Sequence, residues 1–253
     1  MTIGKEDNGT TSIYTGGATG LLLFDSGSFS VNNLIMASKS GPNTGSGAKA
    51  TATLTIGGGT FTVNGGPITL AAQTGAGVTG SANATLNLLG GTFRSGSDIL
   101  TGPSNCTSTV NLDGGTLDMT RHAIGMNAQT VTVFNARSGT LMNLGEFNNG
   151  APLVKTGGGT LTLDGTNTYA GATIVSNGIL RLTGGVCLPP RPRNFTSRPA
   201  PSASSTTPES CSFMPSSSTA NRKKALSTAR RICRPSSPEQ VPSSCLSKER
   251  CSG

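Results

Sequence analysis

The chain has 253 residues, of which only 34% are hydrophobic and 4% aromatic, and tryptophan is absent. No stretch approaches the roughly 20 apolar residues of a transmembrane helix, so the composition excludes a helical membrane span in this sequence. Residues 1–186 carry 8 basic and 8 acidic side chains, so the formal net charge of +8 arises in residues 187–253. The first part of the chain therefore lacks the excess of positive charge that is typical of a nucleic-acid-binding domain.

A short glycine-rich pattern recurs along the first part of the chain. It reads FDSGSFSV at 24–31, IGGGTFTV at 56–63, LLGGTFRS at 88–95, LDGGTLDM at 112–119 and NARSGTLM at 135–142. The apolar anchor of the pattern falls at Phe29, Phe61, Phe93, Leu117 and Leu141, in steps of 32, 32, 24 and 24 residues. Regular spacing of this kind predicts a solenoid or array of repeats.

Each repeat contains segments that alternate small polar with aliphatic residues. They are ATATLTI (50–56), ATLNL (84–88), STVNL (108–112), TVTVF (130–134) and GTLTL (159–163). Alternation with a period of two predicts half-buried strands. A second short apolar segment follows most anchors, at 33–37, 67–71, 98–102 and 122–126. We therefore expect two or three short strands in each repeat.

These strands, separated by glycine-rich turns, predict an all-β fold of the parallel β-helix type. One rung would take about 24–32 residues and stack on the next at about 4.8 Å. The few aromatic residues suit a narrow interior. A β-propeller is the competing architecture, but its repeat of about 40–50 residues is longer than the spacing found here.

One local cluster of residues has the composition of a catalytic or calcium site. Asp113, Asp118, Arg121 and His122 lie close together in sequence, and polysaccharide lyases and hydrolases use such groups on β-helices. However, Asp113 precedes two glycines, where Asp ordinarily forms a turn. Asp118 and His122 would share a strand face only if no turn separated them. Cys106 could act as a nucleophile with His122, the only histidine, as its partner, but nothing else in the sequence supports this pair.

Three glycine-containing segments resemble ligand-binding motifs only in part. GAGVTG (75–80), with Asp98 downstream, matches the dinucleotide fingerprint, but a strand follows it where a helix is required. GPNTGSGAK (41–49) lacks the Gly-Lys-Ser/Thr of a phosphate loop. LDGGTLD (112–118) is a single imperfect copy of a calcium-binding repeat. We therefore predict no catalytic residue, no cofactor and no metal site.

Alternating threonines in TATLT (51–55) and TVTV (130–133) form a further pattern. Exposed on a strand face, they would make a ladder suited to ice or glycan contact. Threonine is also a favourable strand residue in general, and this plainer explanation is preferred.

The segment LVKTGGGTLTLDGTNTYAGATIVSNGILRL (153–182) resembles the autotransporter-associated β-strand repeat of type V secreted passenger proteins. The matching positions are Lys155, Gly157, Gly159, Thr160, Leu161, Leu163, Gly165, Asn167, Thr168, Tyr169, Gly171, Thr173, Val175, Gly178, Leu180 and Leu182. The resemblance implies a right-handed β-helix outside the cell or at the outer membrane, acting as scaffold, stalk or adhesin. It implies no catalytic residues.

Some features of the family are not found in this sequence. Residues 1–17 contain no apolar core of a signal peptide, and the C-terminal part contains no series of amphipathic barrel strands. We therefore expect a segment of a larger protein. Its partners would be surface glycans or a host or neighbouring cell surface, and its ends could mediate self-association. The alternative function is a carbohydrate-active enzyme on the same fold.

The composition changes sharply near Val186. Thirty-five of the 36 glycines precede this point, whereas 10 of the 14 prolines and 5 of the 6 cysteines follow it. We predict an N-terminal segment or partial rung at 1–18, β-solenoid repeats at 19–186 and a disordered basic tail at 187–253. The tail is either genuine or an out-of-frame translation product. Its cysteine spacing does not suit zinc, and its basic run at 222–231 predicts no specific nucleic-acid binding.

Overall fold

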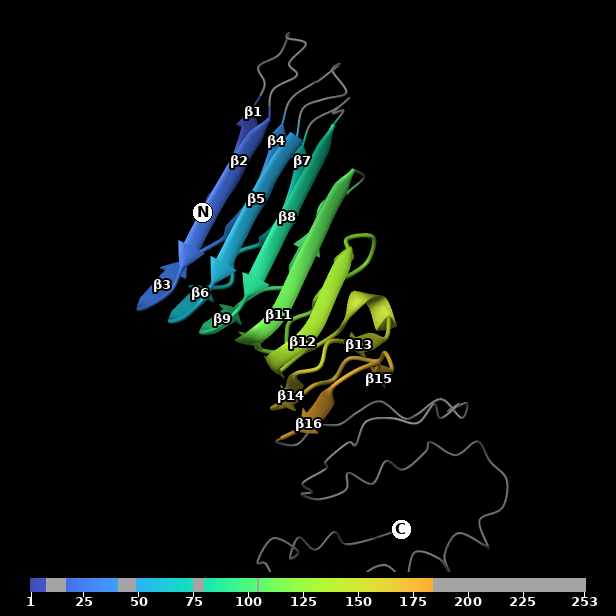
Figure 1. Cartoon of the computed structure of the whole chain (residues 1–253). Helices are drawn as coiled ribbons and strands as arrows, with labels where there is room; N and C mark the ends of the chain where they lie inside the picture. The colour runs from blue at the N-terminus through green and yellow to red at the C-terminus, as the bar shows by residue number, and fades with distance from the viewer. Residues whose placement is uncertain (8–16, 41–48, 75–79, 104, 184–253) are drawn as a thin grey trace, which may run out of the picture. The chain divides into compact units, whose positions relative to one another are not determined.

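The computed structural model describes residues 1–7, 17–40, 49–74, 80–103 and 105–183. Their regular structure consists of 16 β-strands and one short 3-10 turn, η1 (Asn148–Gly150) (Figure 1). The all-β class predicted from the alternating segments is therefore confirmed. Within these ranges, no helix has the length and apolar character needed to cross a membrane. The predicted tail at 187–253 lies outside the described residues and stays a prediction.

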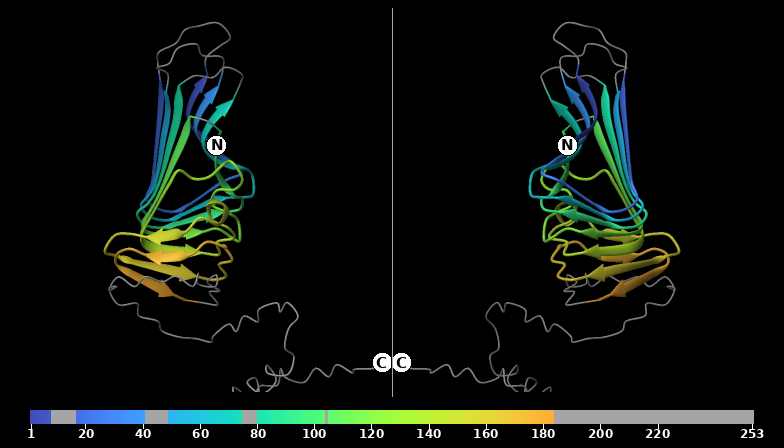
Figure 2. Two further views of the ribbon diagram at one scale, coloured as in Figure 1. Left: turned by 90° about the vertical axis from the view of Figure 1, so that its right-hand side faces the viewer. Right: turned by 90° about the vertical axis from the view of Figure 1, so that its left-hand side faces the viewer.

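Parallel pairing between successive repeats builds the fold, because in the N-terminal half each strand pairs with the strand three places later. One sheet contains β1 (Thr2–Asp7), β4 (Leu34–Ser40), β7 (Ile68–Thr74) and β10 (Ile99–Thr101). The central part of the second sheet contains β2 (Ala18–Phe24), β5 (Lys49–Ile56), β8 (Ser81–Leu88), β11 (Cys106–Asp118) and β12 (Val133–Met142). Its remaining strands are β3 (Ser28–Val31), β6 (Thr60–Val63), β9 (Thr92–Ser95), β13 (Leu153–Lys155), β14 (Thr160–Asp164), β15 (Thr173–Val175) and β16 (Ile179–Leu182). The chain thus coils, and we call each turn of the coil a rung (Figure 2).

The anchor residues of the repeat pair directly with one another. Phe29 pairs with Phe61, Phe61 with Phe93, Phe93 with Leu117 and Leu117 with Leu141. Because each pairing is in register, the five anchors form one inward-facing column along the stack. The column continues to Leu163 and Leu182. The right-handed coiling implied by the family resemblance stays a prediction.

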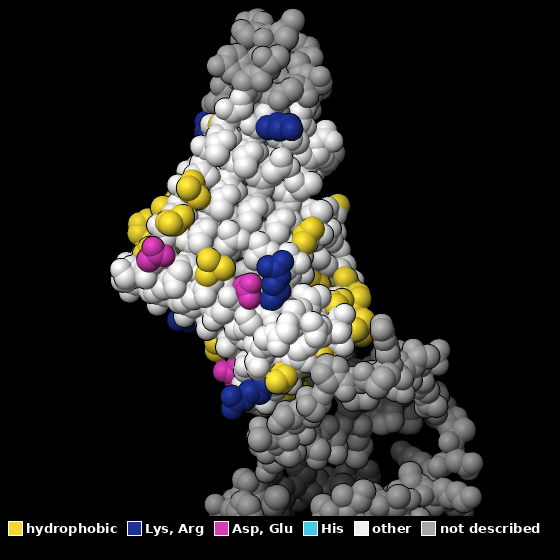
Figure 3. Space-filling view, in the orientation of Figure 1, with side chains coloured by type: hydrophobic (Ala, Val, Ile, Leu, Met, Phe, Trp, Pro, Cys, Tyr) yellow, Lys and Arg dark blue, Asp and Glu magenta, His cyan; other side chains and the backbone are white. Residues whose placement is uncertain are grey.

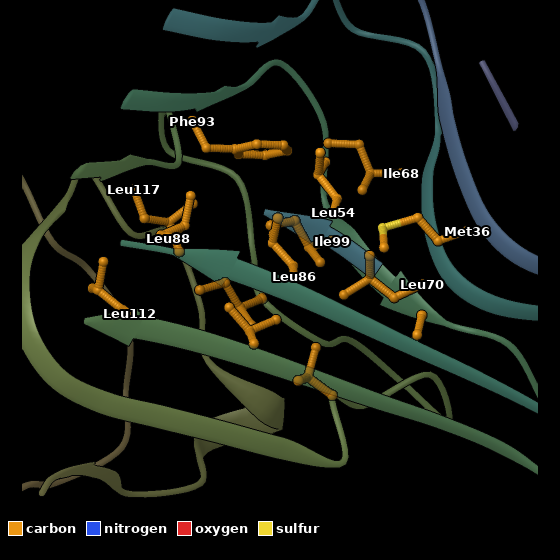
Figure 4. Close-up of a cluster of buried hydrophobic side chains, with 14 of the residues drawn as sticks. Met36, Leu54, Ile68, Leu70, Leu86, Leu88, Phe93, Ile99, Leu112 and Leu117 are labelled. Atoms are coloured by element: carbon orange, nitrogen blue, oxygen red, sulfur yellow. The ribbon is translucent and has the colours of Figure 1, made fainter. Parts of the chain in front are cut away.

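The core lies between the two sheets and is filled by the inward residues of each rung. Met36 and Leu70 come from the first sheet, and Leu54 and Leu86 face them from the second (Figure 4). At the corner of the rung, the rings of Phe61 and Phe93 stack with centroids 5.7 Å apart and an interplanar angle of 8°. Alanines occupy the inward positions at the start of β5 and β8, at 50, 52, 82 and 84. Small residues there let the opposing backbones approach closely.

Glycines form the corner before β6 and β9 because the chain turns sharply there while packing on the previous rung. Gly91 has a φ of +59°, and a Cβ atom at this position would lie 2.5 Å from the backbone of Gly58. Any larger residue would therefore clash with backbone atoms that cannot move aside. At the equivalent place in the next rung, β11 runs on through Gly114 and Gly115 with shifts of register. The turn predicted at Asp113 is thus a bulge within a strand.

Two predicted strands differ from the structure. The segment 130–134 becomes strand only from Val133 onward. The segment 122–126 forms no strand and contributes isolated bridges, in which Ile124 pairs with Ile99 and Phe147. The reason is local: Thr120 and Arg121 both have positive φ, which turns the chain before it can extend.

Candidate functional site

The acidic residues that are close together in the sequence have different partners in the structure. The exposed carboxylate of Asp113 lies 3.6 Å from Nη1 of Arg137 and accepts a hydrogen bond of 2.9 Å from the Ser138 hydroxyl. Both partners belong to β12, the strand paired with β11. Asp113 therefore links two successive rungs, at the bulge of β11.

Asp118 has a different set of partners. Its Oδ1 atom accepts hydrogen bonds from the Thr120 backbone and from Nδ2 of Asn143, each 3.0 Å long. Its Oδ2 atom lies 3.9 Å from Nε of Arg94 on the preceding rung. Asp118 thus contacts the rungs on both sides of it.

His122 and Arg121 do not complete a site with Asp118. The turn at Thr120 and Arg121 intervenes, and Nδ1 of His122 lies 3.5 Å from Oδ1 of Asp98 instead. The same Asp98 oxygen accepts the backbone N–H of Ala123 at 2.7 Å. The backbone N–H of Arg121 donates to the Asn143 carbonyl at 2.7 Å.

Cys106, the other candidate, begins β11 and is half-buried. Burial raises the pKa of its thiol to about 11, although a hydrogen bond with the Gln73 backbone acts in the opposite direction. A pKa this high leaves little thiolate at neutral pH, so the side chain is a poor nucleophile. Within the described residues, no hydrogen bond joins Cys106 to His122, because Cys106 begins β11 whereas His122 follows the turn after this strand.

The ligand-binding patterns noted in the sequence fall largely outside the described residues. The loop at 41–49 is described only at Lys49 and that at 75–80 only at Gly80. The strand expected after the second loop is present as β8. In the part of the chain that the structure describes, no group of three or more His, Cys, Asp or Glu residues is placed to hold a metal ion.

The most extensive polar contacts lie in the C-terminal rungs and begin with Lys155. This side chain is fully buried on β13, and its Nζ donates to the carbonyls of Thr156, Gly157 and Asn177 at 2.5, 2.8 and 3.0 Å. Burial lowers the pKa of Lys155, while the Asp113 carboxylate opposes that change. The ammonium group joins the turn after β13 to the turn one rung further on.

Asn167 and Thr168 make the equivalent connection to the preceding rung. The buried amide of Asn167 accepts the Leu144 backbone N–H and donates to the Asp164 carbonyl, both at 2.9 Å. The Thr168 hydroxyl donates to the Gly145 carbonyl at 2.9 Å. These bonds satisfy backbone groups that the irregular turns leave without strand partners.

Tyr169 and Gly171 complete the packing of this turn. The buried Tyr169 hydroxyl lies 2.5 Å from the Thr173 hydroxyl, and burial raises the pKa of the phenol. A Cβ atom at position 171 would lie 2.0 Å from the Ala151 carbonyl oxygen, so only glycine fits. The polar and glycine positions of this segment therefore share one role, the attachment of one rung to the next.

The segment with these contacts is similar to a known repeat family. Residues 153–182 match the passenger-associated-transport-repeat family. The resemblance to autotransporter passenger repeats is therefore confirmed for this segment. Neither a curated protein nor a solved structure gave a significant match to the chain. The repeat family indicates an autotransporter passenger and an extracellular or surface location, consistent with a structural role.

The outer face of the second sheet extends beyond the two threonine runs noted in the sequence. The outward side chains of β2, β5, β8, β11 and β12 form three columns along the stack, which we call the threonine–asparagine face. The columns are Thr19, Thr51, Asn83 and Thr107; Leu21, Thr53, Thr85, Thr109 and Val133; and Leu23, Thr55, Asn87, Asn111 and Asn135. The signal in the sequence was the spacing of these residues, which follows the same steps of 32, 32, 24 and 24 residues as the anchors.

Proposed function

We propose that the described part of residues 1–183 forms a structural, non-catalytic segment of an autotransporter-like passenger, located outside the cell or at the outer membrane. The observation that supports this function is the use of polar side chains in the matched repeat. Lys155, Asn167 and Thr168 bond to backbone atoms of neighbouring rungs. Side chains held by these hydrogen bonds stabilise the stack and are not available for catalysis.

The carboxylates outside the repeat support the same proposal. Asp98, Asp113 and Asp118 each contact residues of another rung. An acid and base pair for sugar hydrolysis requires two carboxyl groups facing one substrate. The enzyme hypothesis predicts carbohydrate cleavage that is lost in Asp113→Ala or Asp118→Ala, whereas our proposal predicts none in the unaltered protein.

We further propose a right-handed coil that serves as scaffold, stalk or adhesive surface, with glycans or a neighbouring cell surface as partners. The first rung supports a role for the ends in self-association. Leu22, Phe24 and Val31 face inward there but remain only partly buried, since no described rung covers them. Strands β1, β2 and β3 each pair on one side only within the described part of the chain.

Surface display of the full chain tests the structural proposal. The chain would be fused between a secretion signal and an outer-membrane translocator, and antibody labelling and protease resistance measured on intact cells. We expect labelled, protease-resistant protein. The destabilised variant is Gly171→Ala, whose new Cβ atom would clash with the previous rung. The matched control is Gly158→Ala, because no other atom would lie within 4 Å of the new Cβ. Retention inside the cell, or digestion as fast as that of Gly171→Ala, would overturn the proposal.

A further inference from the structure

The threonine–asparagine face differs chemically from the rest of the stack. Most of its outward side chains are hydroxyls and amides, with Leu21, Leu23 and Val133 as the apolar exceptions. The charged residues of the same strands lie outside the three columns, with Lys49 at the start of β5 and Asp113 and Arg137 next to the asparagine column in β11 and β12. The Arg137 and Asp113 charges also pair with each other. Figure 3 shows a broad area of uncharged polar surface over these strands, with apolar side chains along both borders and adjoining acidic and basic side chains in its lower part.

Hydrogen bonds along the stack hold the outer columns in place. Nδ2 of Asn111 donates to Oδ1 of Asn87 and Nδ2 of Asn135 donates to Oδ1 of Asn111, both at 2.7 Å. Nδ2 of Asn87 continues the series to the Thr55 hydroxyl at 3.2 Å. On the other side, the Thr107 hydroxyl donates to Oδ1 of Asn83. The side chains that border the central column are therefore ordered before any partner arrives.

The central column has unused hydrogen-bonding capacity. Within the described residues, the hydroxyls of Thr53, Thr85 and Thr109 make no hydrogen bond to protein and are partly exposed. Each hydroxyl can donate one bond and accept two. They lie on paired strands, so successive hydroxyls are about 4.8 Å apart along the stack.

The dimensions of the face suit an extended and flat partner. Five strands at about 4.8 Å spacing and three outward positions per strand give an area of about 19 Å by 13 Å. Several sugar rings of a ribbon-like polymer fit on such an area. A coiled polymer would touch only one or two rungs at a time.

The composition of the face decides between partner classes. A charged polymer would find no opposing charge in the central column, so Coulombic attraction is small. A protein interface would be expected to centre on aromatic residues or arginine, which these three columns do not contain. At the border, Leu21 and Leu23 are 68% and 59% exposed and offer apolar surface beside the hydroxyls. Sugar rings are complementary to such a surface, because they have apolar C–H faces and hydroxyl groups at their edges.

We propose that the threonine–asparagine face binds a flat, neutral, β-linked polysaccharide through the free hydroxyls of Thr53, Thr85 and Thr109. This inference rests on the proposed surface role, because such polymers are met outside the cell. Compared with the proposed surface role, this inference specifies which face of the stack makes the contact and restricts the partner to neutral glycans. A rigid array reduces the ordering cost of binding, which compensates for the small number of bonds in each rung.

Adsorption to microcrystalline cellulose tests the inference with the full, purified chain. The test variant is Thr53→Val/Thr85→Val/Thr109→Val, which removes hydroxyls while keeping shape and strand preference. The control is Thr92→Val/Thr116→Val/Thr140→Val, an outward threonine column of the same stack. That column lies beside the charged residues Arg94 and Asp118. Thermal unfolding and circular dichroism check that both variants fold.

We expect the unaltered chain and the control to bind within about twofold of each other. The test variant should bind at least about tenfold more weakly, since each lost hydrogen bond is worth about a factor of three to ten. A single Thr85→Lys variant, which places a charge at the centre of the face, should lose binding to a similar extent. No adsorption by the folded protein, equal losses in both triple variants, or adsorption to ice crystals without adsorption to cellulose would overturn the inference. Surface display is measured separately, so a displayed chain that fails to bind cellulose would refute only this inference.

Discussion

Substitution of Phe61 by alanine is the most direct test of the stacked core. The Phe61 ring is fully buried and contacts three other rings. Its centroid lies 5.3 Å from that of Phe29, 5.7 Å from that of Phe93 and 6.0 Å from that of Phe24. Loss of a buried phenylalanine removes apolar contacts and leaves a cavity, which together cost about 3–5 kcal/mol. We expect a loss of about 4 kcal/mol in the free energy of unfolding.

Phe29→Ala provides the matched control, because Phe29 occupies the same column one rung earlier. This side chain is 40% exposed at the N-terminal end of the stack. Burial of about 60% of a side chain worth about 3 kcal/mol when fully buried contributes about 2 kcal/mol. Water fills the vacated space at an open end, so the cavity contribution is small. The two variants should differ by about 2 kcal/mol.

Urea denaturation followed by far-ultraviolet circular dichroism measures the difference. With a slope of about 2 kcal/mol per molar urea, the midpoint should fall by about 2 M for Phe61→Ala and by about 1 M for Phe29→Ala. Rungs can unfold in separate steps, so hydrogen exchange at β5 and β8 should locate the weakened region. Equal midpoints for the two variants, or a loss below about 1 kcal/mol for Phe61→Ala, would refute the stacked core.

Three further predictions concern the C-terminal rungs and the thiol. Lys155→Met should destabilise the protein by about 2–4 kcal/mol in urea denaturation, since three carbonyls lose a charged donor; an unchanged midpoint would contradict this. Gly171→Ala should lower stability by about 1–3 kcal/mol through its clash with Ala151, whereas Gly158→Ala should change it by less than about 1 kcal/mol. With the five tail cysteines replaced by serine, iodoacetamide should alkylate Cys106 slowly at pH 8 and faster as the pH rises toward 11, because only the thiolate reacts. Rapid alkylation of the folded protein at pH 8 would show that the thiol is not buried as described.

The spacing of the anchor residues carried most of the information about the fold. Phe29, Phe61 and Phe93 recur at one step because each occupies the same place in a rung, and the structure pairs them directly. The all-β class and most strand positions followed from alternation of polar and aliphatic residues. Prediction was poorest at 120–132, where Thr120 and Arg121 adopt positive φ. These residue types give no local signal of such a turn.

The candidate site was less predictable than the fold. Asp113, Asp118 and His122 are close in sequence, but their partners Arg137, Asn143 and Asp98 come from other segments. Proximity along the chain suggested one cluster, whereas the coil gave each residue a different partner, with Asp113 and Asp118 against the following rung and His122 against the preceding one. Lys155 was recognised as a repeat position, yet its three acceptor carbonyls became apparent only from the turns that surround it.

The sequence by itself determined the repeat, the strand alternation and the match of residues 153–182 to a passenger repeat family, because these depend on the order and spacing of residue types. Only the tertiary structure decided which side chains meet across rungs. Parallel register aligns residues 24 or 32 positions apart, as it does for Thr85 with Thr109 and Thr53. A column of hydroxyls or amides therefore arises from the stacking of rungs, and no single segment of the chain contains it.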